Sequence, residues 1–545
     1  MRAAGAAPRS DRLTYCALAL FVAGLWFATL SSRPLFNTDE GRYAEIPREM
    51  LVSGDWAIPH LDGLVYLEKP PLQYWATAAS LEIFGQNELG ARFYTALCAL
   101  GAVLAAALAA RRLWGAGAAL RTAALLPSML LFVLMGQLLT LDMSLTAYMT
   151  AALAAFLAAQ SAAPRQERLL MLIAWAATAL GVLTKGPVAA AIPGAVLVLY
   201  SLWSRDFSPW RRLHAAAGVA LFLAIALPWY LVAAHRVPGF LEFFFVHEHI
   251  ARYLTPSAHR GEVFWFFVPV MLLGSLPWTL PSLRALCRGW RLRTAGFDPG
   301  LFLRLWVLFV LAFFSLSDSK LIPYVLPALP ALALLAASLP EELLERDLAR
   351  TAFLTLAVAL ALGLACLLVP GHVAPSERTP YFLPLAKPLA RIALLLAASG
   401  VYVLVQRRRG ATRSAVFLAA GWCLAGLLLV QAAAGVAPVY SGVTLARALP
   451  RPDAPVYSVA TYDQTLPFYW GRTVRLVAYR GELDFGLTRD PAAEVPDIDR
   501  FLEIWDRAPR AYAVMEKKTF AELEDRHVPM RELAHDANRV LVARH

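Results

Sequence analysis

Residues 13–45 read LTYCALALFVAGLWFATLSSRPLFNTDEGRYAE, an apolar run followed closely by two adjacent carboxylates, Asp39 and Glu40. The apolar part has about 18 residues, a length that can cross the hydrocarbon core of a bilayer as one helix. No clean small-x-small cleavage site follows it, so we interpret the run as a retained membrane helix and not as a signal peptide. The role of the two carboxylates then depends on the side of the membrane on which they lie.

The composition indicates a polytopic membrane protein. Of the 545 residues, 59% are hydrophobic and only 16% are charged, whereas soluble domains carry about a quarter charged residues. Apolar segments of about 20 residues recur along the chain, which predicts an all-α bundle of roughly 13 spans. The segments start near residues 13, 89, 117, 142, 167, 186, 213, 263, 301, 320, 351, 388 and 413.

The net charge of +11 does not point to nucleic acid, because of where the excess lies. Residues 438–545 contain 15 Lys and Arg against 16 Asp and Glu, so the tail is close to neutral. The positive excess belongs to the apolar region, as a positive-inside bias produces. The five cysteines form neither a zinc-type spacing nor a disulfide framework.

Arginine-rich loops predict the topology. With the N-terminus in the cytoplasm, every second loop is basic, which favours an odd number of spans and an outward-facing tail. The loops predicted to face the periplasm are 32–88, 137–141, 184–186, 234–262, 316–320 and 370–387.

The tail alternates strand-like and helix-like segments. Runs such as PVYSVA, TVRLVAY, AYAVMEKK and RVLVAR have the pattern of strands, and DIDRFLEIWD and TFAELEDR have the pattern of helices. We therefore expect a transmembrane domain over residues 1–437, with a long first loop at 32–88, and a small α/β periplasmic domain over residues 438–545.

Polar residues that a membrane protein usually avoids gather on the predicted outer face. Any one of them also fits an interfacial anchor or an aromatic belt, and the histidines alone also fit solvated loop residues. A carboxylate at the start of an apolar helix, as in LTLDMSL, is costly and usually functional, and several segments converge on one face, so we predict a joint site. Its candidate residues are Asp39, Glu40, Glu68, Lys69, Asp142, Lys185, His247, His249, Arg252 and Tyr324.

These residue types suit chemistry on an anionic lipid. Lys69, Lys185 and Arg252 come from separate loops and are able to surround a phosphate. Asp39 and Asp142 are able to orient or deprotonate an acceptor, or to face the positive charge that develops on a sugar ring. Glu68 with either His247 or His249 offers ligands for a divalent ion that bridges to phosphate.

At these motifs the chain resembles a known family. The block TDEGRYAEIPREML…GDWAIPHLDGLVYLEKPPLQYW, with TKGP, FFFVHEHIARY and SKLIPYVLP, is similar to the bacterial lipid A aminoarabinose transferases. These belong to the polyprenyl-phosphate-sugar glycosyltransferases, a group that includes the protein O-mannosyltransferases. The resemblance covers nearly the whole chain, and the first-loop block is its most specific part.

The resemblance implies a GT-C fold, an inner-membrane enzyme with a periplasmic site, undecaprenyl phosphate carrying 4-amino-4-deoxy-L-arabinose as the donor, and a lipid A phosphate as the acceptor. It implies no nucleic-acid partner and no organic cofactor, but a divalent metal such as Zn²⁺. It also implies roles for single residues: catalytic carboxylates Asp39 and Asp142, phosphate-binding Lys69 and Lys185, metal ligands Glu68 and His249, and cavity tyrosines Tyr43, Tyr66 and Tyr324.

Two departures from the family pattern matter. The aminoarabinose branch commonly reads Asp-Glu-Thr-Arg-Tyr where this chain has Gly41, which leaves the sugar open, and His247 competes with His249 as a metal ligand. Glu40 is expected to act as a structural partner beside the sugar pocket.

Other functions fit parts of the sequence. A phosphate monoester acceptor is largely dianionic at neutral pH and needs little help from a base, whereas a hydroxyl acceptor, as in an O-mannosyltransferase, needs one. Transfer to another envelope glycolipid is a second alternative. A transporter of lipid-linked sugars is a third, although transporters usually show internal repeats and polar groups near the midplane. The tail suits either a cap over the lipid cavity or substrate recognition.

Overall fold

The structure, a computed structural model, describes residues 9–251, 262–290, 296–372, 374, 376–406 and 410–544. The contacts between Cα atoms divide the chain into two compact units. The first unit contains residues 1–29, 95–366 and 389–429, and the second contains residues 30–94, 367–388 and 430–545. The second unit therefore combines most of the first loop with the tail.

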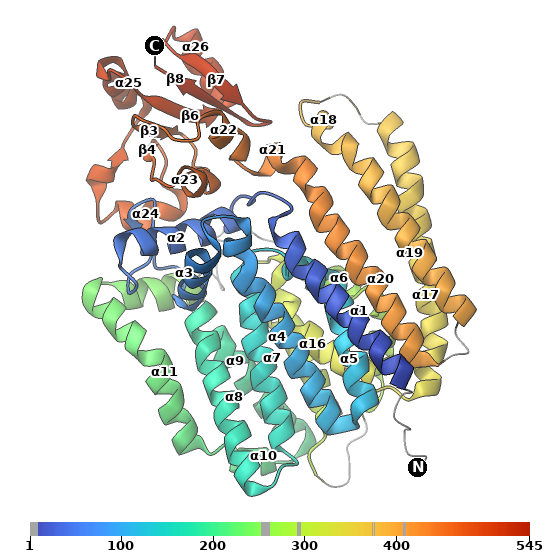
Figure 1. Ribbon diagram of the computed structural model, residues 1–545. Coiled ribbons are helices and arrows are strands. Elements are labelled where there is room, and N and C mark those ends of the chain that lie inside the picture. The colour runs from blue at the N-terminus through green and yellow to red at the C-terminus, as the bar shows by residue number, and fades with distance from the viewer. Residues whose placement is uncertain are drawn as a thin grey trace. The chain divides into compact units, whose positions relative to one another are not determined.

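The first unit is a bundle of apolar helices, which Figure 1 shows running side by side. Several of the helices extend by a few residues into the second unit. The long helices are α1 (Arg9–Ala28), α4 (Glu88–Trp114), α7 (Leu141–Ala159), α8 (Pro164–Lys185), α9 (Val188–Ser204), α11 (Ala215–Arg236), α15 (Pro299–Ser315), α17 (Glu341–Leu368), α19 (Ala386–Gln406) and α20 (Ala411–Ala432). The shorter ones are α5 (Ala116–Ser128), α6 (Leu130–Met135), α10 (Ser208–Arg211), α13 (Phe267–Gly274), α14 (Thr279–Cys287), α16 (Leu329–Ala337), the 3-10 helix Ile322–Ala328 and the π-helix Glu242–Ala251.

The helices confirm a multi-pass membrane architecture. Among the described residues, 8 helices are long and apolar enough to span a bilayer, or 9 when the bent pair α13 and α14 counts as one span. Three shorter apolar stretches add to these. The predicted starts lie close to observed helices, apart from the segment placed at 351, whose helix begins at Glu341. The exact number of 13 spans stays a prediction.

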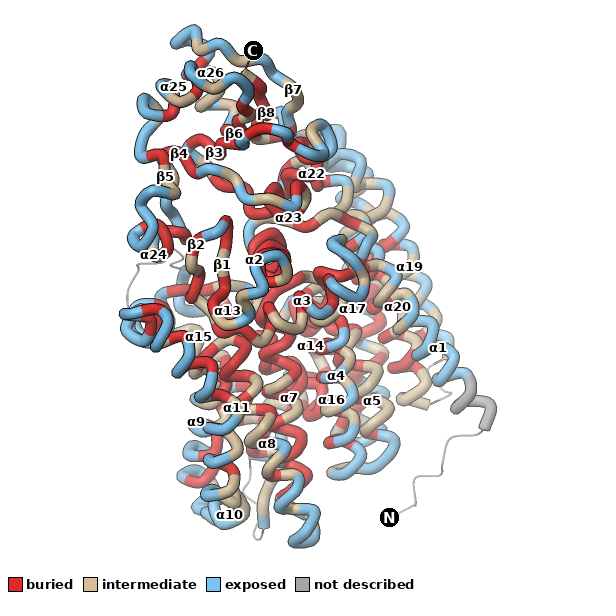
Figure 2. Tube along the Cα trace, turned by 60° about the vertical axis from the view of Figure 1, so that its left-hand side comes forward, coloured by how far each residue is buried: buried red, intermediate tan, exposed pale blue. Residues whose placement is uncertain are grey.

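Helix α7 lies at the centre of this bundle. It packs against α8 along its length, and 83% of its apolar window is buried by protein, against 11% for the first span. Figure 2 shows the resulting contrast between buried α7 and the exposed outer helices. A helix shielded from lipid in this way is able to carry a polar residue at its end.

The first-loop part of the second unit forms its own small elements. Helix α2 (Asp39–Ser53) is buried along most of its first three turns, and it packs against α3 (Leu72–Phe84) and against α23 in the tail. A short hairpin of β1 (His60–Leu61) and β2 (Leu64–Val65) lies between the two helices in sequence. Residues 367–388 add the 3-10 helices Val369–Gly371 and Leu383–Leu385 and the single turn α18 (Thr379–Phe382).

The tail contains the predicted α/β domain. Its sheet has the order β5-β4-β3-β6-β8-β7, in which the first four strands are parallel, β8 is antiparallel to β6, and β7 is antiparallel to β8. The strands are β3 (Val456–Val459), β4 (Arg475–Val477), β5 (Glu494–Val495), β6 (Tyr512–Glu516), β7 (Arg531–His535) and β8 (Arg539–Ala543). The helices are α21 (Ala437–Tyr440), α22 (Val443–Ala448), α23 (Thr465–Trp470), α24 (Asp484–Leu487), α25 (Ile498–Arg507) and α26 (Lys517–Asp525), with 3-10 turns at Gly481–Leu483 and Pro491–Ala493.

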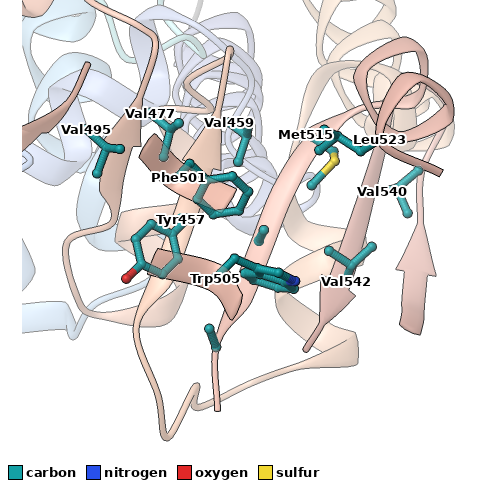
Figure 3. Packing of buried hydrophobic residues seen from close by; sticks show 12 residues of the cluster. Tyr457, Val459, Val477, Val495, Phe501, Trp505, Met515, Leu523, Val540 and Val542 are labelled. Carbon is teal, nitrogen blue, oxygen red and sulfur yellow. The ribbon is translucent and has the colours of Figure 1, made fainter. Parts of the chain in front are cut away.

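Both faces of this sheet are covered. Alternate residues of a strand point to opposite faces, and alternate residues here join two different cores. Figure 3 shows one core, where Phe501 and Trp505 of α25 pack on Val459 and Val542. Val456, Val514 and Leu541 belong to the other core, which contains Leu445, Leu466 and Trp470 of α22 and α23. The near-continuous apolar strands of the tail follow from this two-sided burial.

Candidate functional site

The predicted catalytic carboxylate Asp39 is the first residue of α2. Its side chain is 46% exposed, and its Oδ1 lies 3.8 Å from Nη1 of Arg42 one turn further on. Arg42 is buried and also pairs with Glu482 in the tail. Asp39 and Glu482, the two partners of Arg42, both belong to the second unit. Asp39 therefore has a fixed cation beside it and a half-exposed carboxylate.

Three tyrosines surround Arg42. Its guanidinium lies over the rings of Tyr43 and Tyr66, 5.7 and 5.9 Å from their centroids, and the Tyr43 ring lies 6.1 Å from that of Tyr74. Burial and the negative charge of Asp39 raise the pKa of Tyr43 well above its usual value, so its phenol stays a neutral donor. The Tyr66 and Tyr74 hydroxyls and Nε of Arg42 are buried and have no hydrogen-bond partner among the described residues. Such groups are costly unless a ligand or water satisfies them.

Glu68 and Lys69 lie in the segment between β2 and α3. Nζ of Lys69 donates to the backbone carbonyl of Glu68 at 2.8 Å. The negative charge of Glu68 contributes to the raised pKa values of Tyr43, Tyr66 and Tyr74. Glu68 is therefore within electrostatic range of the tyrosine group.

Glu40 is directed elsewhere, although it is the neighbour of Asp39. Its carboxylate is buried and accepts from Arg33 at 2.6 and 3.0 Å and from Arg92 at 2.8 and 3.0 Å. Burial alone would raise the pKa of Glu40, but the two guanidinium groups outweigh it and hold the pKa well below its usual range. Glu40 thus ties the first residues after the first span to the beginning of α4.

In the first unit, the helix ends bring another set of predicted residues together. Asp142 is in the first turn of α7, and Lys185 is the last residue of α8. Nζ of Lys185 forms an ion pair with Oδ1 of Asp142 and lies 4.7 Å from the centroid of the Tyr324 ring. A carboxylate at a helix N-terminus and a lysine at a helix C-terminus are both favoured by the helix dipoles.

His249 lies beside this group. Its Nε2 is 3.5 Å from the carbonyl oxygen of Lys185, and its ring occupies the space that a side chain at position 186 would need. A Cβ on Gly186 would lie 2.5 Å from Nε2 of His249, and its φ of +90° also disfavours other residues. His247, by contrast, is 66% exposed and lies 3.4 Å from Glu248.

The predicted site residues therefore fall into two groups, each described within its own unit. Asp39, Tyr43, Tyr66 and Glu68 lie together in the second unit, and Asp142, Lys185, Tyr324 and His249 lie together in the first. Arg252 lies outside the described residues. Sequence reasoning missed a third set, Arg42, Tyr74, Gln464 and Glu482. Arg42 and Tyr74 lie within the motifs DEGRY and LQYW, and these motifs could have identified them as site residues. No sequence pattern marks Gln464 or Glu482.

The described residues do not assemble a complete metal centre. No group of three or more His, Cys, Asp or Glu side chains able to hold a metal ion occurs among them. The tautomer of His249 would suit a metal, because Nδ1 lies 2.6 Å from the carbonyl oxygen of Phe244 and so carries the proton. Glu68 and His249 belong to different units, and the divalent ion stays a prediction.

The fold is that of a multi-pass membrane protein with an α/β domain in its tail, and the comparison with known proteins defines its class as a glycosyltransferase. A family model described as dolichyl-phosphate-mannose-protein mannosyltransferase matches residues 12–244, and one described as aminoarabinose transferase C-terminal domain matches residues 443–544. The undecaprenyl phosphate-alpha-4-amino-4-deoxy-L-arabinose arabinosyl transferase of Pseudomonas aeruginosa is 36% identical over 426 residues, covering 77% of this chain and 76% of that protein. The enzyme of the same name from Aeromonas salmonicida is 33% identical and covers 77% and 73%.

A solved structure matches over nearly the full length. The crystal structure of ArnT from Cupriavidus metallidurans bound to undecaprenyl phosphate has a TM-score of 0.91 and 35% identity, and the likeness covers 98% of each chain. Its apo form has a TM-score of 0.89. The chain belongs to the aminoarabinose transferase family.

Proposed function

We propose that this protein transfers 4-amino-4-deoxy-L-arabinose from undecaprenyl phosphate to a phosphate of lipid A. The observation that carries the proposal is the likeness, over about three quarters of both chains, to arabinosyl transferases whose names specify this lipid-linked sugar. The full-length likeness to a structure bound to undecaprenyl phosphate supports the same donor.

The geometry suits this chemistry. Asp39 offers an exposed carboxylate, and the group around Arg42 offers buried polar atoms that need a partner. In the proposed reaction, the acceptor phosphate oxygen attacks the anomeric carbon, the bond from that carbon to the donor phosphate breaks, and undecaprenyl phosphate leaves. Asp39 would face the positive charge that develops on the sugar ring and orient the acceptor.

Lys69, within the second unit, and Lys185, within the first, are each proposed as a cation for the donor phosphate, with Arg252 as a further one. Asp142 would hold the ammonium group of Lys185 in place until phosphate arrives, because the two side chains already form an ion pair. Tyr43 and Tyr66 would line the sugar pocket within the second unit, and Tyr324 would lie beside the phosphate-binding Lys185. We assign Glu40 a structural role instead, since its oxygens are used by Arg33 and Arg92.

We also propose that the protein lies in the inner membrane with its N-terminus in the cytoplasm and its site and tail in the periplasm. The alternation of basic loops supports this orientation, and a fusion of alkaline phosphatase to the tail, active only in the periplasm, tests it. A divalent ion with His249 as one ligand is part of the proposal, but no step above depends on it. Metal analysis of the purified protein and of H249A tests it directly.

Comparison of lipid A by mass spectrometry, in cells with and without the gene, tests the function. The expected result is the mass increment of aminoarabinose only where the gene is present, and its loss in Asp39→Asn, with transfer reduced by about 100-fold or more. The D39N protein should still be inserted at the normal level. Unchanged lipid A together with altered glycoproteins would instead support a protein mannosyltransferase, the activity named by the family model over residues 12–244.

A further inference from the structure

The tail packs directly on the start of α2, where Asp39 lies. Nδ2 of Asn37 donates to Oδ2 of Asp463 at 2.5 Å. A Cβ on Gly41 would lie 2.5 Å from the carbonyl carbon of Gln464 and 2.6 Å from the backbone nitrogen of Thr465. This close approach leaves no room for a side chain at position 41. The packing within the second unit therefore explains why this chain has glycine there, where the family commonly has threonine.

The third contact from the tail involves charge. Arg42 lies between two carboxylates: Nη2 donates to Oε2 of Glu482, and Nη1 lies 3.8 Å from Oδ1 of Asp39. Glu482 is itself oriented by Gln464, whose Nε2 donates to Oε1 at 2.9 Å. The Arg42 and Glu482 side chains are 8% and 15% exposed, and an ion pair so well shielded from water has a well-defined geometry.

The Asp39–Arg42 distance is longer than that of a direct hydrogen bond. An arginine on a helix is able to form a direct hydrogen-bonded pair with an aspartate one turn away. Here the guanidinium is turned toward Glu482, so Asp39 keeps a nearby positive charge but does not give up its oxygens to it. Its carboxylate stays available to a substrate.

We infer that Glu482 is a positioning residue for the transfer reaction, which holds Arg42 away from Asp39, and that Gln464 orients Glu482. The inference rests on the proposed function. It makes the tail a part of the active site: residues 463–482 set the geometry of a carboxylate that belongs to the first loop.

Steady-state transfer from donor lipid to lipid A, measured for purified variants, tests this inference. Glu482→Gln should lower kcat by about tenfold or more while the KM for the donor changes by less than about threefold, since the substrate contacts remain. Glu482→Asp, which keeps the charge, should lose less. Asp499→Asn is the matched control, because Asp499 forms an ion pair in the same tail with Arg526 and its side chain is 82% exposed, and it should keep its activity.

A double-mutant cycle separates positioning from general stability. In an Arg42→Ala background, E482Q should change kcat by less than about twofold, because Glu482 acts only through Arg42. An additive loss, or a lower unfolding temperature as the only effect of E482Q, would overturn the inference, as would an E482Q enzyme with normal kcat. If the unaltered protein transfers no aminoarabinose at all, the proposed function fails and not the role of Glu482.

Discussion

Asp39 and Glu40 are neighbours in the sequence but have different surroundings. Asp39 is partly exposed and forms a loose ion pair with Arg42, whereas Glu40 accepts hydrogen bonds from two buried arginines. A buried carboxylate with two guanidinium partners neutralises part of their charge, and removing it leaves both cations uncompensated. At the residue scale, the second carboxylate therefore supports the fold and the first is available for chemistry.

We expect Glu40→Gln to destabilise the protein by about 3–5 kcal/mol, because it leaves Arg33 and Arg92 buried without their anion. Thermal unfolding in detergent measures the change, and D39N, with its more exposed side chain, should unfold close to the normal temperature. The pKa of Glu40 is lowered in the folded protein, so its contribution is complete above the ordinary carboxyl pKa and is lost only as the pH falls below it. An E40Q protein with normal stability would contradict this assignment.

At the scale of elements, the site depends on where helices end. Helix α8 ends at Lys185 because Gly186, with its positive φ, terminates it, and α7 begins with Asp142 in its first turn. The two helices pack against each other along their length. Their ends therefore hold the ion pair rigidly, and Gly186 leaves room for His249 beside it.

Asp142 and Lys185 should behave as one unit in catalysis. We expect Asp142→Asn and Lys185→Met each to lower transfer by about 100-fold, and the double variant to be little worse than either, since residues that act together are not additive. The same lipid A assay measures all three. Independent, multiplying losses would mean that the two side chains have separate roles.

At the scale of the whole molecule, the second unit is assembled from separate stretches of the chain. Arg48 of α2 donates to the carbonyl oxygen of Gly471, and Asp62 beside the hairpin accepts from the backbone of Val474. Tyr469 donates to Glu88 at the start of α4. These contacts join α2, the hairpin and the start of α4 to the tail, so the first loop and the tail depend on each other.

Truncation after residue 437 should therefore disturb the first loop. We expect the shortened protein to be inactive and to be cleaved by protease within residues 37–67, because the buried side of α2 loses its cover. The helices of the first unit have their own core and should remain protected. Limited proteolysis followed by mass spectrometry locates the cuts, and a first loop as resistant as in the full-length protein would show that it folds without the tail.

The sequence by itself determined the membrane helices, the α/β tail and most of the candidate residues. Span length and the alternation of apolar residues are local properties, and motifs such as YLEKPPLQYW and LTKGP keep their residues together along the chain. The alternating strands and helices of the tail appear where their patterns predict them, at β3, β4, β6, β8, α25 and α26.

Only the tertiary structure decided how those residues are used. Arg42 and Glu482 are 440 residues apart, Glu40 and Arg92 are 52 apart, and Asp142 and Lys185 are 43 apart. An ion pair between distant segments leaves no periodic trace in either one, because each side chain alone is an ordinary charged residue. The partner of each carboxylate, and with it the difference between Asp39 and Glu40, follows only from the packing that brings those segments together.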